Sequence, residues 1–241
     1  MISSFWKAFV TNEAQQRPYR YQSLKYTDAF RLLEIPNSAK DPFRLHEHSI
    51  SKAPPFTTLS YTWGSSIQDG PTIAEYANTT LPFQVANAGD PKRAWARVTK
   101  SLFEALIILR NGQIAKTKFI WADGLCINQG DAGEKASQVA LMGEIYSRSE
   151  QTIVWLGKGD SHTKDFFDLH MRLCGPLNRY FGTTGFQAPN FDLTVANIQE
   201  HLQTEIPARL WSSYCTFCEQ RRWFMRTWVA QEIALSRDIR V

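Results

Sequence analysis

Apolar runs without polar alternation recur along the chain, and helical patterns separate them. The runs Phe56–Gly64, Lys118–Asp123 and Thr152–Gly157 are rich in β-branched and aromatic residues, and each ends in a glycine or an acid. Helices are predicted between them, beginning near Ser101 and near Asp131. Buried strands that alternate with helices are typical of a parallel sheet covered on both faces. The pattern therefore predicts an α/β fold.

Both predicted helices begin with the spacing of a capping box, in which a polar residue is followed three positions later by glutamate. Ser101 is followed by Glu104, and Asp131 by Glu134. Helical spacing then predicts two buried stripes, made of Leu102, Ala105, Leu106 and Leu109 in the first helix and of Val139, Met142, Gly143 and Tyr146 in the second.

The segment before this core has a different pattern. Residues 19–55 hold two predicted short strands, Phe30–Ile35 and Phe43–Ile50, with prolines that stop each strand from continuing. We expect a hairpin-like annex whose first strand lies at the edge of the sheet. The stretch 65–98 is expected to be irregular, apart from a small strand over Thr79–Val85.

A second interruption follows the last run. Residues 158–221 contain turn-forming glycine, proline and asparagine between helices expected near 163–174 and 193–203, so this segment is interpreted as an insertion. We therefore expect an N-terminal arm over 1–18, annex strands over 19–55, a core made of 56–157 and 222–241, and the insertion over 158–221.

The C-terminal stretch carries an acid on an apolar helical stripe. Met225, Trp228, Val229 and Glu232 fall at positions i, i+3, i+4 and i+7, and Arg237–Val241 is expected to begin another strand. An isolated ionised carboxylate that faces a core costs several kcal/mol or more. We therefore expect Glu232 to be protonated, paired with a cation or lining a cavity.

Composition and charge narrow the classes of protein. The chain has 241 residues, 43% of them hydrophobic and 21% charged, which is ample for one sizeable core. Its net charge of +4 comes from 27 basic and 23 acidic residues spread along the sequence, without the basic cluster that binds nucleic acid. No apolar run is long enough to span a membrane, and no leader peptide is recognised. Four cysteines make no disulfide framework, so we expect a cytoplasmic protein.

Polar and aromatic residues gather where the predicted parallel strands end. Ligands of open α/β sheets bind beyond the carboxyl ends of the strands. The candidates there are Ser60, Tyr61, Trp63, Gly64, Asp123, Asn128 and Trp155. If the helix of Glu232 packs against the same edge, two carboxylates face one cleft. Two acids with stacking aromatic rings can bind a sugar or nucleotide and stabilise a developing oxocarbenium ion.

Each candidate also has a purely structural interpretation. Asp123 at a strand end can simply cap the following turn, and Glu232 can form an ion pair with Arg226 or another arginine. The tryptophans at positions 63, 121, 155 and 228 fit a core better than a ligand platform.

The cysteines and histidines give weak chemical signals. Cys126 follows a buried run and fits inert burial better than a nucleophile. The Cys215-x2-Cys218 pair has no partner pair, and the histidines are scattered, so no metal site is expected. The motifs of serine hydrolases, P-loop NTPases and dinucleotide-binding folds are absent from the sequence.

Three ordered blocks resemble the fungal heterokaryon incompatibility (HET) domain. They are Leu59-Ser-Tyr-Thr-Trp-Gly64, then Trp121-Ala-Asp-Gly-Leu-Cys-Ile-Asn-Gln129 continuing through Glu134 and Gln138-Val139, and Arg226-Thr-Trp-Val-Ala-Gln-Glu232. With Arg31-Leu-Leu-Glu34 ahead of them, the resemblance spans about residues 20–241. It implies a role in non-self recognition, in which fusion of unlike fungal cells triggers programmed cell death.

A weaker resemblance connects the chain to Toll/interleukin-1 receptor (TIR) domains, which have a flavodoxin-like parallel sheet. TIR domains that cleave NAD+ carry a glutamate in a Trp-Cys-x-x-Glu helix, and Trp228 and Glu232 have the same spacing, with Val229 for the cysteine. By this analogy Glu232 is the catalytic residue, Trp228 joins the substrate-binding candidates, and NAD+ is a substrate while no cofactor is required.

Two functions therefore remain open at this stage. One is an effector that destroys NAD+. The other is a non-enzymatic module that signals by self-association. For either one, the resemblance implies a regulatory or sensor domain, or a partner protein that restrains it.

Overall fold

The computed structural model describes residues 17–38, 40–64, 66–67, 80–90, 92–112, 114–184 and 205–241. They belong to two compact units. The first contains the described residues within Met1–Ser66, Gly70–Gly157 and Met225–Val241, and the second those within Ile67–Asp69 and Lys158–Phe224.

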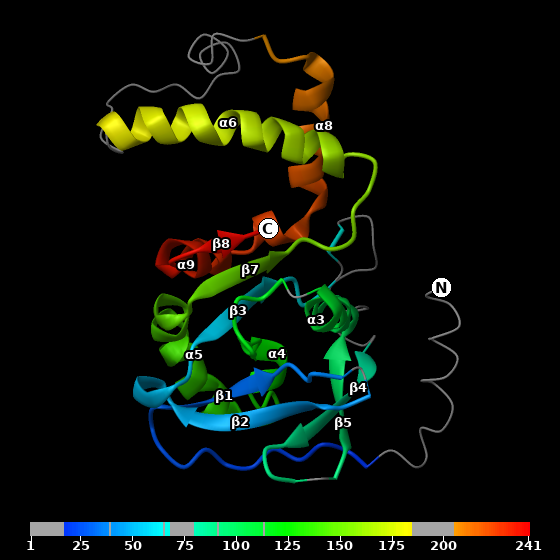
Figure 1. The fold of residues 1–241 in the computed structure, drawn as a ribbon, viewed down its shortest axis with the longest axis vertical. Helices are drawn as coiled ribbons and strands as arrows, with labels where there is room; N and C mark the ends of the chain where they lie inside the picture. Colours follow the sequence, from blue (N-terminus) through cyan, green and yellow to red (C-terminus); the bar gives the residue numbers. More distant parts are fainter. Residues whose placement is uncertain are drawn as a thin grey trace. The chain divides into compact units, whose positions relative to one another are not determined.

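One mixed sheet of eight strands organises the described part of the first unit (Figure 1). Its spatial order is β5 (Ala94–Thr99), β4 (Thr80–Asn87), β2 (Phe43–Ser49), β1 (Ala29–Glu34), β6 (Phe119–Trp121), β3 (Phe56–Tyr61), β7 (Gln151–Trp155) and β8 (Ile239–Arg240). The three apolar runs form β3, β6 and β7, which pair in parallel, and β8 pairs in parallel with β7. The carboxyl ends of these strands therefore lie at one edge of the sheet.

The parallel sheet predicted for the core is only part of the observed sheet, which is mixed. β1 runs antiparallel to both β2 and β6, and β4 runs antiparallel to β5. A short hairpin connection forces β1 and β2 to be antiparallel, and β1 then joins the parallel strands through the pairs Leu33–Ile120 and Glu34–Phe119. β1 is consequently an interior strand and not the edge strand that we expected, because β2, β4 and β5 extend the sheet beyond it.

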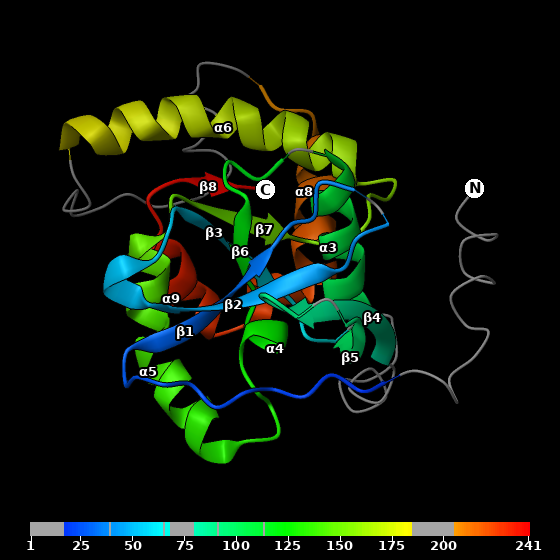
Figure 2. The ribbon, with the colours of Figure 1, turned by 60° about the horizontal axis from the view of Figure 1, so that its bottom comes forward.

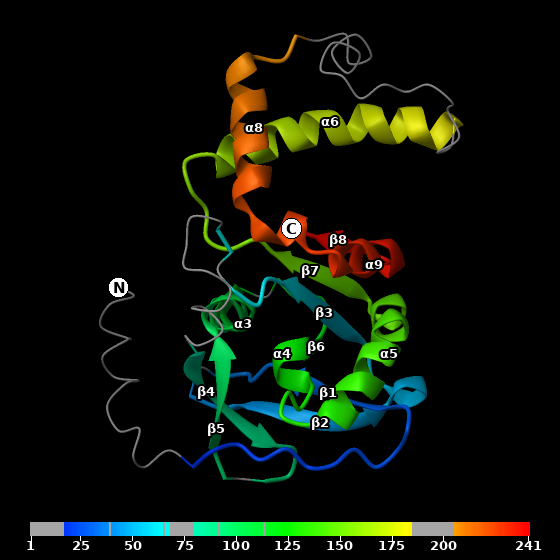
Figure 3. The ribbon, with the colours of Figure 1, turned by 180° about the vertical axis from the view of Figure 1, so that it is seen from behind.

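Helices lie on both sides of the central strands. Their bounds in the first unit are α3 (Lys100–Gly112), α4 (Asp123–Cys126), α5 (Ala132–Arg148) and α9 (Trp228–Leu235), with a 3-10 turn η2 (Ile50–Lys52) after β2. Figures 1, 2 and 3 place α3 on one side of β3, β6 and β7, and α5 with α9 on the other. Since a carboxylate on α9 reaches a side chain of β3, α9 is part of the layer that covers the parallel strands.

The helix starts differ in detail from the predicted capping boxes. α3 begins at Lys100, and the Thr99 hydroxyl, in place of Ser101, accepts the main-chain NH of Leu102 at 3.3 Å. At α5 the predicted N-cap is present, because Asp131 Oδ1 accepts the NH groups of Gly133 and Glu134 at 2.9 and 3.0 Å. The Glu134 carboxylate, however, bonds elsewhere, to Arg31.

The second unit contains two helices in its described part, α6 (Thr163–Thr184) and α8 (Ala208–Gln220), followed by the 3-10 turn η3 (Arg222–Met225), whose last residue belongs to the first unit. Phe166 of α6 stacks on Phe217 of α8 with ring centroids 4.1 Å apart. The helix expected near 163–174 is thus α6, while the one expected over 193–203 and most of the arm over 1–18 lie outside the described residues.

Candidate functional site

A buried glutamate meets the carboxyl end of the central strand. Glu232 is only 2% exposed. Its Oε2 accepts a hydrogen bond from the Ser60 hydroxyl on β3, and the Tyr146 hydroxyl on α5 also hydrogen-bonds to it. These contacts join a strand and two helices that are far apart in sequence. Glu232 is therefore paired, which is one of the three states expected for an acid on an apolar stripe.

Two small features hold α9 in this place. A Cβ atom at Gly143 of α5 would lie 3.1 Å from Nε2 of Gln231, so the missing side chain lets the two helices approach closely. At the end of α9 the Ser236 hydroxyl hydrogen-bonds to the Glu232 carbonyl and to Thr152 of β7, each at 2.5 Å. The position of the carboxylate is thus set by contacts in the middle and at the C-terminal end of its own helix.

Arg226 connects this glutamate to the strand end. Its Nη2 donates to Glu232 Oε1 at 3.3 Å, and its Nη1 donates to the Tyr61 carbonyl at 2.5 Å. The Arg226–Glu232 ion pair considered from the sequence is therefore present, but it is long and has a single contact. Arg226 is the cation common to the two acids of the site, since its charge lowers the pKa of both Glu232 and Asp123.

Asp123 is the second acid, at the start of α4. The Trp63 indole nitrogen donates to its Oδ2 at 2.7 Å, and the Tyr61 hydroxyl also hydrogen-bonds to the carboxylate. The NH of Gly124 donates to the Tyr61 hydroxyl oxygen at 3.2 Å, and a Cβ at Gly124 would lie 2.4 Å from that oxygen. A glycine at this position allows the tyrosine to reach the aspartate.

Burial favours the neutral form of both acids. It raises the pKa of Asp123 above its usual value, and the hydrogen bonds of Trp63 and Tyr61 only partly oppose this effect. Burial likewise raises the pKa of Glu232, against the opposing Arg226 charge and Ser60 hydrogen bond, and the nearby charge of Asp123 raises it further. The pKa of Tyr61 lies well above 10, first through burial and then through Asp123, so Tyr61 keeps its proton as a donor.

Three donors at the ends of the parallel strands have no acceptor among the residues that the structure describes. They are the Thr62 hydroxyl after β3, the Trp121 indole of β6 and the Trp155 indole of β7. Trp121 is fully buried, with its ring edge-to-face on Tyr146 at 5.7 Å, while Trp155 is half-buried beside Tyr61 in the register. Buried donors usually have partners, so this edge has hydrogen-bonding capacity to spare.

The apolar stripe predicted for the Glu232 helix is not formed as one face. Met225 is 66% exposed and Trp228 52% exposed, and Glu232 is the one buried residue of α9. Met225 lies in η3 and α9 begins only at Trp228, so the single helix that the spacing assumed is interrupted. Met225 and Trp228 therefore do not share the buried face of Glu232.

Some expected site residues lie apart from this network. The Asn128 side chain accepts the NH of Gly130 at 3.2 Å and shapes its own loop, and its main-chain NH donates to Glu134. Trp228 points outward, and Gly64 is buried without a polar contact to either acid among the described residues. The structure thus brings together Ser60, Tyr61, Trp63, Asp123 and Glu232.

Sequence reasoning named Tyr146 only as a core residue. Its helical stripe predicted burial, but not a hydroxyl that reaches Glu232. Cys126 is buried, and burial raises the pKa of its thiol to about 12, so it stays protonated.

Within the described ranges, no three His, Cys, Asp or Glu side chains are arranged to hold a metal ion. Likewise, none of the helices that the structure describes is both long and apolar enough to cross a membrane.

Fold and site together define a mixed α/β domain in which three separated stretches of sequence converge on two carboxylates, the buried Glu232 and the half-buried Asp123. A family model described as "Heterokaryon incompatibility protein (HET)" matches residues 56–232, and the chain belongs to this family. It is 38% identical over 113 residues to heterokaryon incompatibility protein 6, OR allele, of Neurospora crassa. That alignment covers 45% of this chain and 15% of the relative, so the chain matches a small part of that protein's length. No solved structure matches the chain.

Proposed function

We propose that this chain is an effector domain of fungal heterokaryon incompatibility that triggers cell death by cleaving the nicotinamide glycosidic bond of NAD+. The family membership and the name of the Neurospora crassa relative support the incompatibility role. The observation that carries the chemistry is the convergence of Asp123 and Glu232, two carboxylates with raised pKa values, at the carboxyl ends of β3 and β6.

The reaction needs an acid-lined site more than a strong nucleophile. The bond between the ribose C1 and nicotinamide breaks, nicotinamide leaves as a neutral base, and the ribose becomes an oxocarbenium ion. Water then adds to C1 and loses a proton, which gives ADP-ribose. In this proposal Glu232 contacts the ribose hydroxyls and, in its ionised form, stabilises the cation, as carboxylates do in glycoside cleavage. Asp123 and the turn from Tyr61 to Gly64 hold the substrate.

The unpartnered donors suit a ligand that is rich in acceptors. NAD+ presents ribose and phosphate oxygens, which the Thr62 hydroxyl and the Trp155 indole could bind after small movements. Glu232 is nearly inaccessible, so the proposal includes displacement of Arg226 when substrate enters. The TIR-like fold proposed from the Trp228–Glu232 spacing gives the same assignment of the glutamate.

The exposed apolar side chains of η3 and α9 favour a second candidate function. Met225, Trp228 and Leu235 are large apolar side chains with 38% or more of their surface exposed. Such residues are typical of contact surfaces between proteins. In this alternative the domain signals by self-association without chemistry, and the Arg226–Glu232 pair only stabilises the helix.

Release of free nicotinamide from NAD+ separates the two functions. The purified full chain is incubated with NAD+ at low and at high protein concentration, beside the variants Glu232→Gln and Asp123→Asn. We expect turnover by the wild type and a loss of at least about 100-fold in Glu232→Gln, the size typical for removal of one transition-state contact. Glu144→Gln on the exposed side of α5 is the matched control and should keep full turnover.

Two outcomes contradict the proposal. Turnover that survives Glu232→Gln would remove Glu232 from the mechanism. Absence of turnover in the wild type at every concentration, together with concentration-dependent assembly that Trp228→Ser abolishes, would favour the non-enzymatic module.

A further inference from the structure

The turn that presents Asp123 cannot hold its own shape. α4 is a single helical turn of four residues, Asp123–Cys126. Isolated helices of this length are unstable in water, because nucleation fixes several residues for few hydrogen bonds. The place of the Asp123 carboxylate therefore depends on groups outside α4 that bind its carbonyl oxygens.

Those carbonyls are capped by side chains from two directions. Gln129 Nε2 donates to the Asp123 carbonyl at 2.9 Å. From the N-terminal segment, the Tyr21 hydroxyl donates to the Leu125 carbonyl at 2.9 Å, and Arg31 Nη1 donates to the Cys126 carbonyl at 3.1 Å. The positive guanidinium at the last carbonyl also suits the negative end of the helix.

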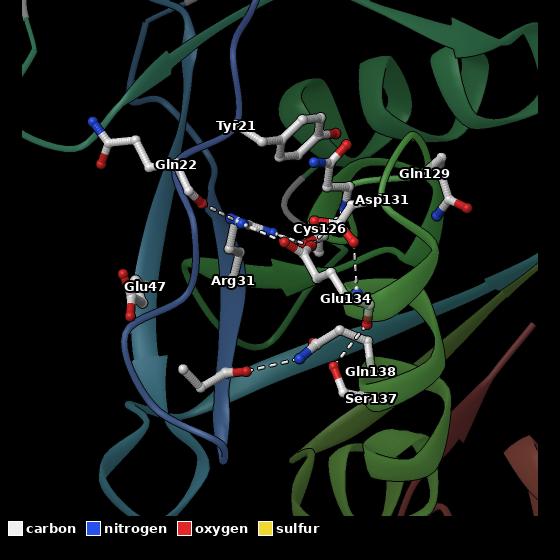
Figure 4. A network of polar contacts seen from close by, with 12 residues as sticks. Tyr21, Gln22, Arg31, Glu47, Cys126, Gln129, Asp131, Glu134, Ser137 and Gln138 are labelled. Atoms are coloured by element: carbon white, nitrogen blue, oxygen red, sulfur yellow. Dashed lines mark hydrogen bonds and ion pairs between the residues drawn. The ribbon is translucent and has the colours of Figure 1, made fainter.

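Arg31 is itself fixed by a buried carboxylate (Figure 4). Its Nη1 and Nη2 atoms lie 2.6 and 3.0 Å from the two carboxylate oxygens of Glu134, and Nη2 also donates to the Gln22 carbonyl at 2.6 Å. Glu134 Oε1 accepts the main-chain NH of Asn128 at 2.7 Å as well. The pair therefore fastens both the end of α4 and the loop that follows it.

We propose that Arg31 and Glu134 are positioning residues for the Asp123 carboxylate. The connection runs from the guanidinium to the Cys126 carbonyl, through one turn of helix to Asp123, and from there to its donors Trp63 and Tyr61. Arg31 precedes the family match over 56–232, so the part of the chain that carries the site residues relies on a residue outside it. This inference rests on the proposed function only in treating Asp123 as a site residue.

The forked shape of the guanidinium, and not its charge alone, suits Arg31 to this positioning role. Arg31 serves the Cys126 carbonyl, the Gln22 carbonyl and both oxygens of Glu134 at once. A lysine ammonium is a point charge on a flexible stem and cannot span four acceptors in a plane. Arg31→Lys therefore keeps the charge but loses the hydrogen bond that holds the end of α4.

The indole NH of Trp63 reports on Asp123 without any activity assay. Its resonance is followed by 15N correlation NMR on the full chain, from about pH 4 to about pH 8, and assigned by its disappearance in Trp63→Phe. In the wild type the resonance should titrate with Asp123, because the indole donates to that carboxylate at 2.7 Å. In Arg31→Lys and Glu134→Gln we expect it to move toward the position of a solvent-exposed indole and to stop titrating with the aspartate.

Two controls separate positioning from stability. Arg148→Lys disturbs an exposed ion pair with Glu144 on the same helix as Glu134, and it should leave the Trp63 resonance unchanged. Tyr21→Phe removes only the hydroxyl bound to Leu125 and should shift the resonance less than Arg31→Lys does. The dispersed resonance of the buried Trp121 indole shows whether each variant is folded. If Arg31→Lys and Glu134→Gln do not fold, Tyr21→Phe still tests the inference.

The inference fails if Arg31→Lys, Glu134→Gln and Tyr21→Phe fold with a lowered melting temperature but keep the wild-type titration of Trp63. Arg31 would then be a stabilising residue only. Because NMR reads this result directly, it stands whether or not the wild-type chain cleaves NAD+, and a failure of the proposed function is distinguished from a failure of the positioning role.

Discussion

Two arginine–glutamate pairs in the described part of the first unit differ in geometry. Arg31 and Glu134 meet through two short contacts, 2.6 and 3.0 Å, and both side chains are almost completely buried. Arg226 and Glu232 meet through one contact of 3.3 Å, and the Arg226 side chain is 22% exposed. Both glutamates lie in recognisable blocks of the HET sequence, so sequence alone does not separate them.

This difference in geometry decides what each pair can do. Burial alone would lower the pKa of Arg31, but the hydrogen bonds and charge of Glu134 outweigh it and raise that pKa. At the other pair burial dominates, and the pKa of Glu232 is raised despite Arg226. A buried pair offsets its desolvation only when its geometry is good. The first pair is therefore a fixed structural clamp. In the second pair, part of the desolvation cost of the Glu232 carboxylate stays uncompensated, as is often found at functional sites.

The largest effect is expected from breaking the tight pair. Glu134→Leu leaves the Arg31 charge buried without its carboxylate, and the free energy of unfolding should fall by about 3–5 kcal/mol. Urea denaturation followed by tryptophan fluorescence measures it. Glu144→Leu removes an exposed partner of Arg148 on the same helix and should cost less than about 1 kcal/mol. A similarly small loss in Glu134→Leu would show that the clamp contributes little to stability.

The sequence predicted the parallel strands well because each strand is marked by a local pattern of residues. β3, β6 and β7 are continuous apolar runs that end in a glycine or an acid. β5 went unrecognised because Ala94-Trp-Ala-Arg-Val-Thr99 mixes small, charged and aromatic residues, and only alternate positions are buried. The antiparallel join of β1 to β6 depends on pairing between residues about 85 positions apart, which no local pattern specifies.

The site shows the same division between local and distant causes. The burial and pairing of Glu232 followed from the cost of a charge on an apolar helix. Its partners Ser60 and Tyr146 did not, because they come from a strand and a helix whose relative placement depends on the whole sheet. Arg31 and Tyr21 were hidden for the same reason, since their acceptors lie about 100 residues further along the chain.

A smaller effect is expected from the loose pair. Glu232→Gln keeps an acceptor for Ser60 and frees Arg226, which already reaches solvent, to turn outward. The free energy of unfolding at neutral pH should change by about 1 kcal/mol or less, the usual net value of one hydrogen bond. The same urea experiment measures it. A loss as large as that of Glu134→Leu would mean that both pairs are structural and that the contrast between them does not hold.

The smallest effect is a change in how stability depends on pH. Glu232 has its folded pKa raised above the usual 4.5, so between those two values the folded state binds more protons than the unfolded state. Stability is therefore greatest below about pH 4.5 with respect to this group and falls as pH rises through the window above it. Comparing wild type with Glu232→Gln cancels the titrations that both proteins share, and the variant should lose less stability across this window.

Ser60→Ala sharpens the same measurement. The Ser60 hydrogen bond lowers the pKa of Glu232, so its removal should raise that pKa further and extend the window in which stability falls toward higher pH. Unfolding curves at intervals of about half a pH unit, for all three proteins, would resolve this order. If wild type and Glu232→Gln lose stability equally, Arg226 compensates Glu232 as fully as Arg31 compensates Glu134, and Glu232 has no energetic reason to release its partner for a substrate.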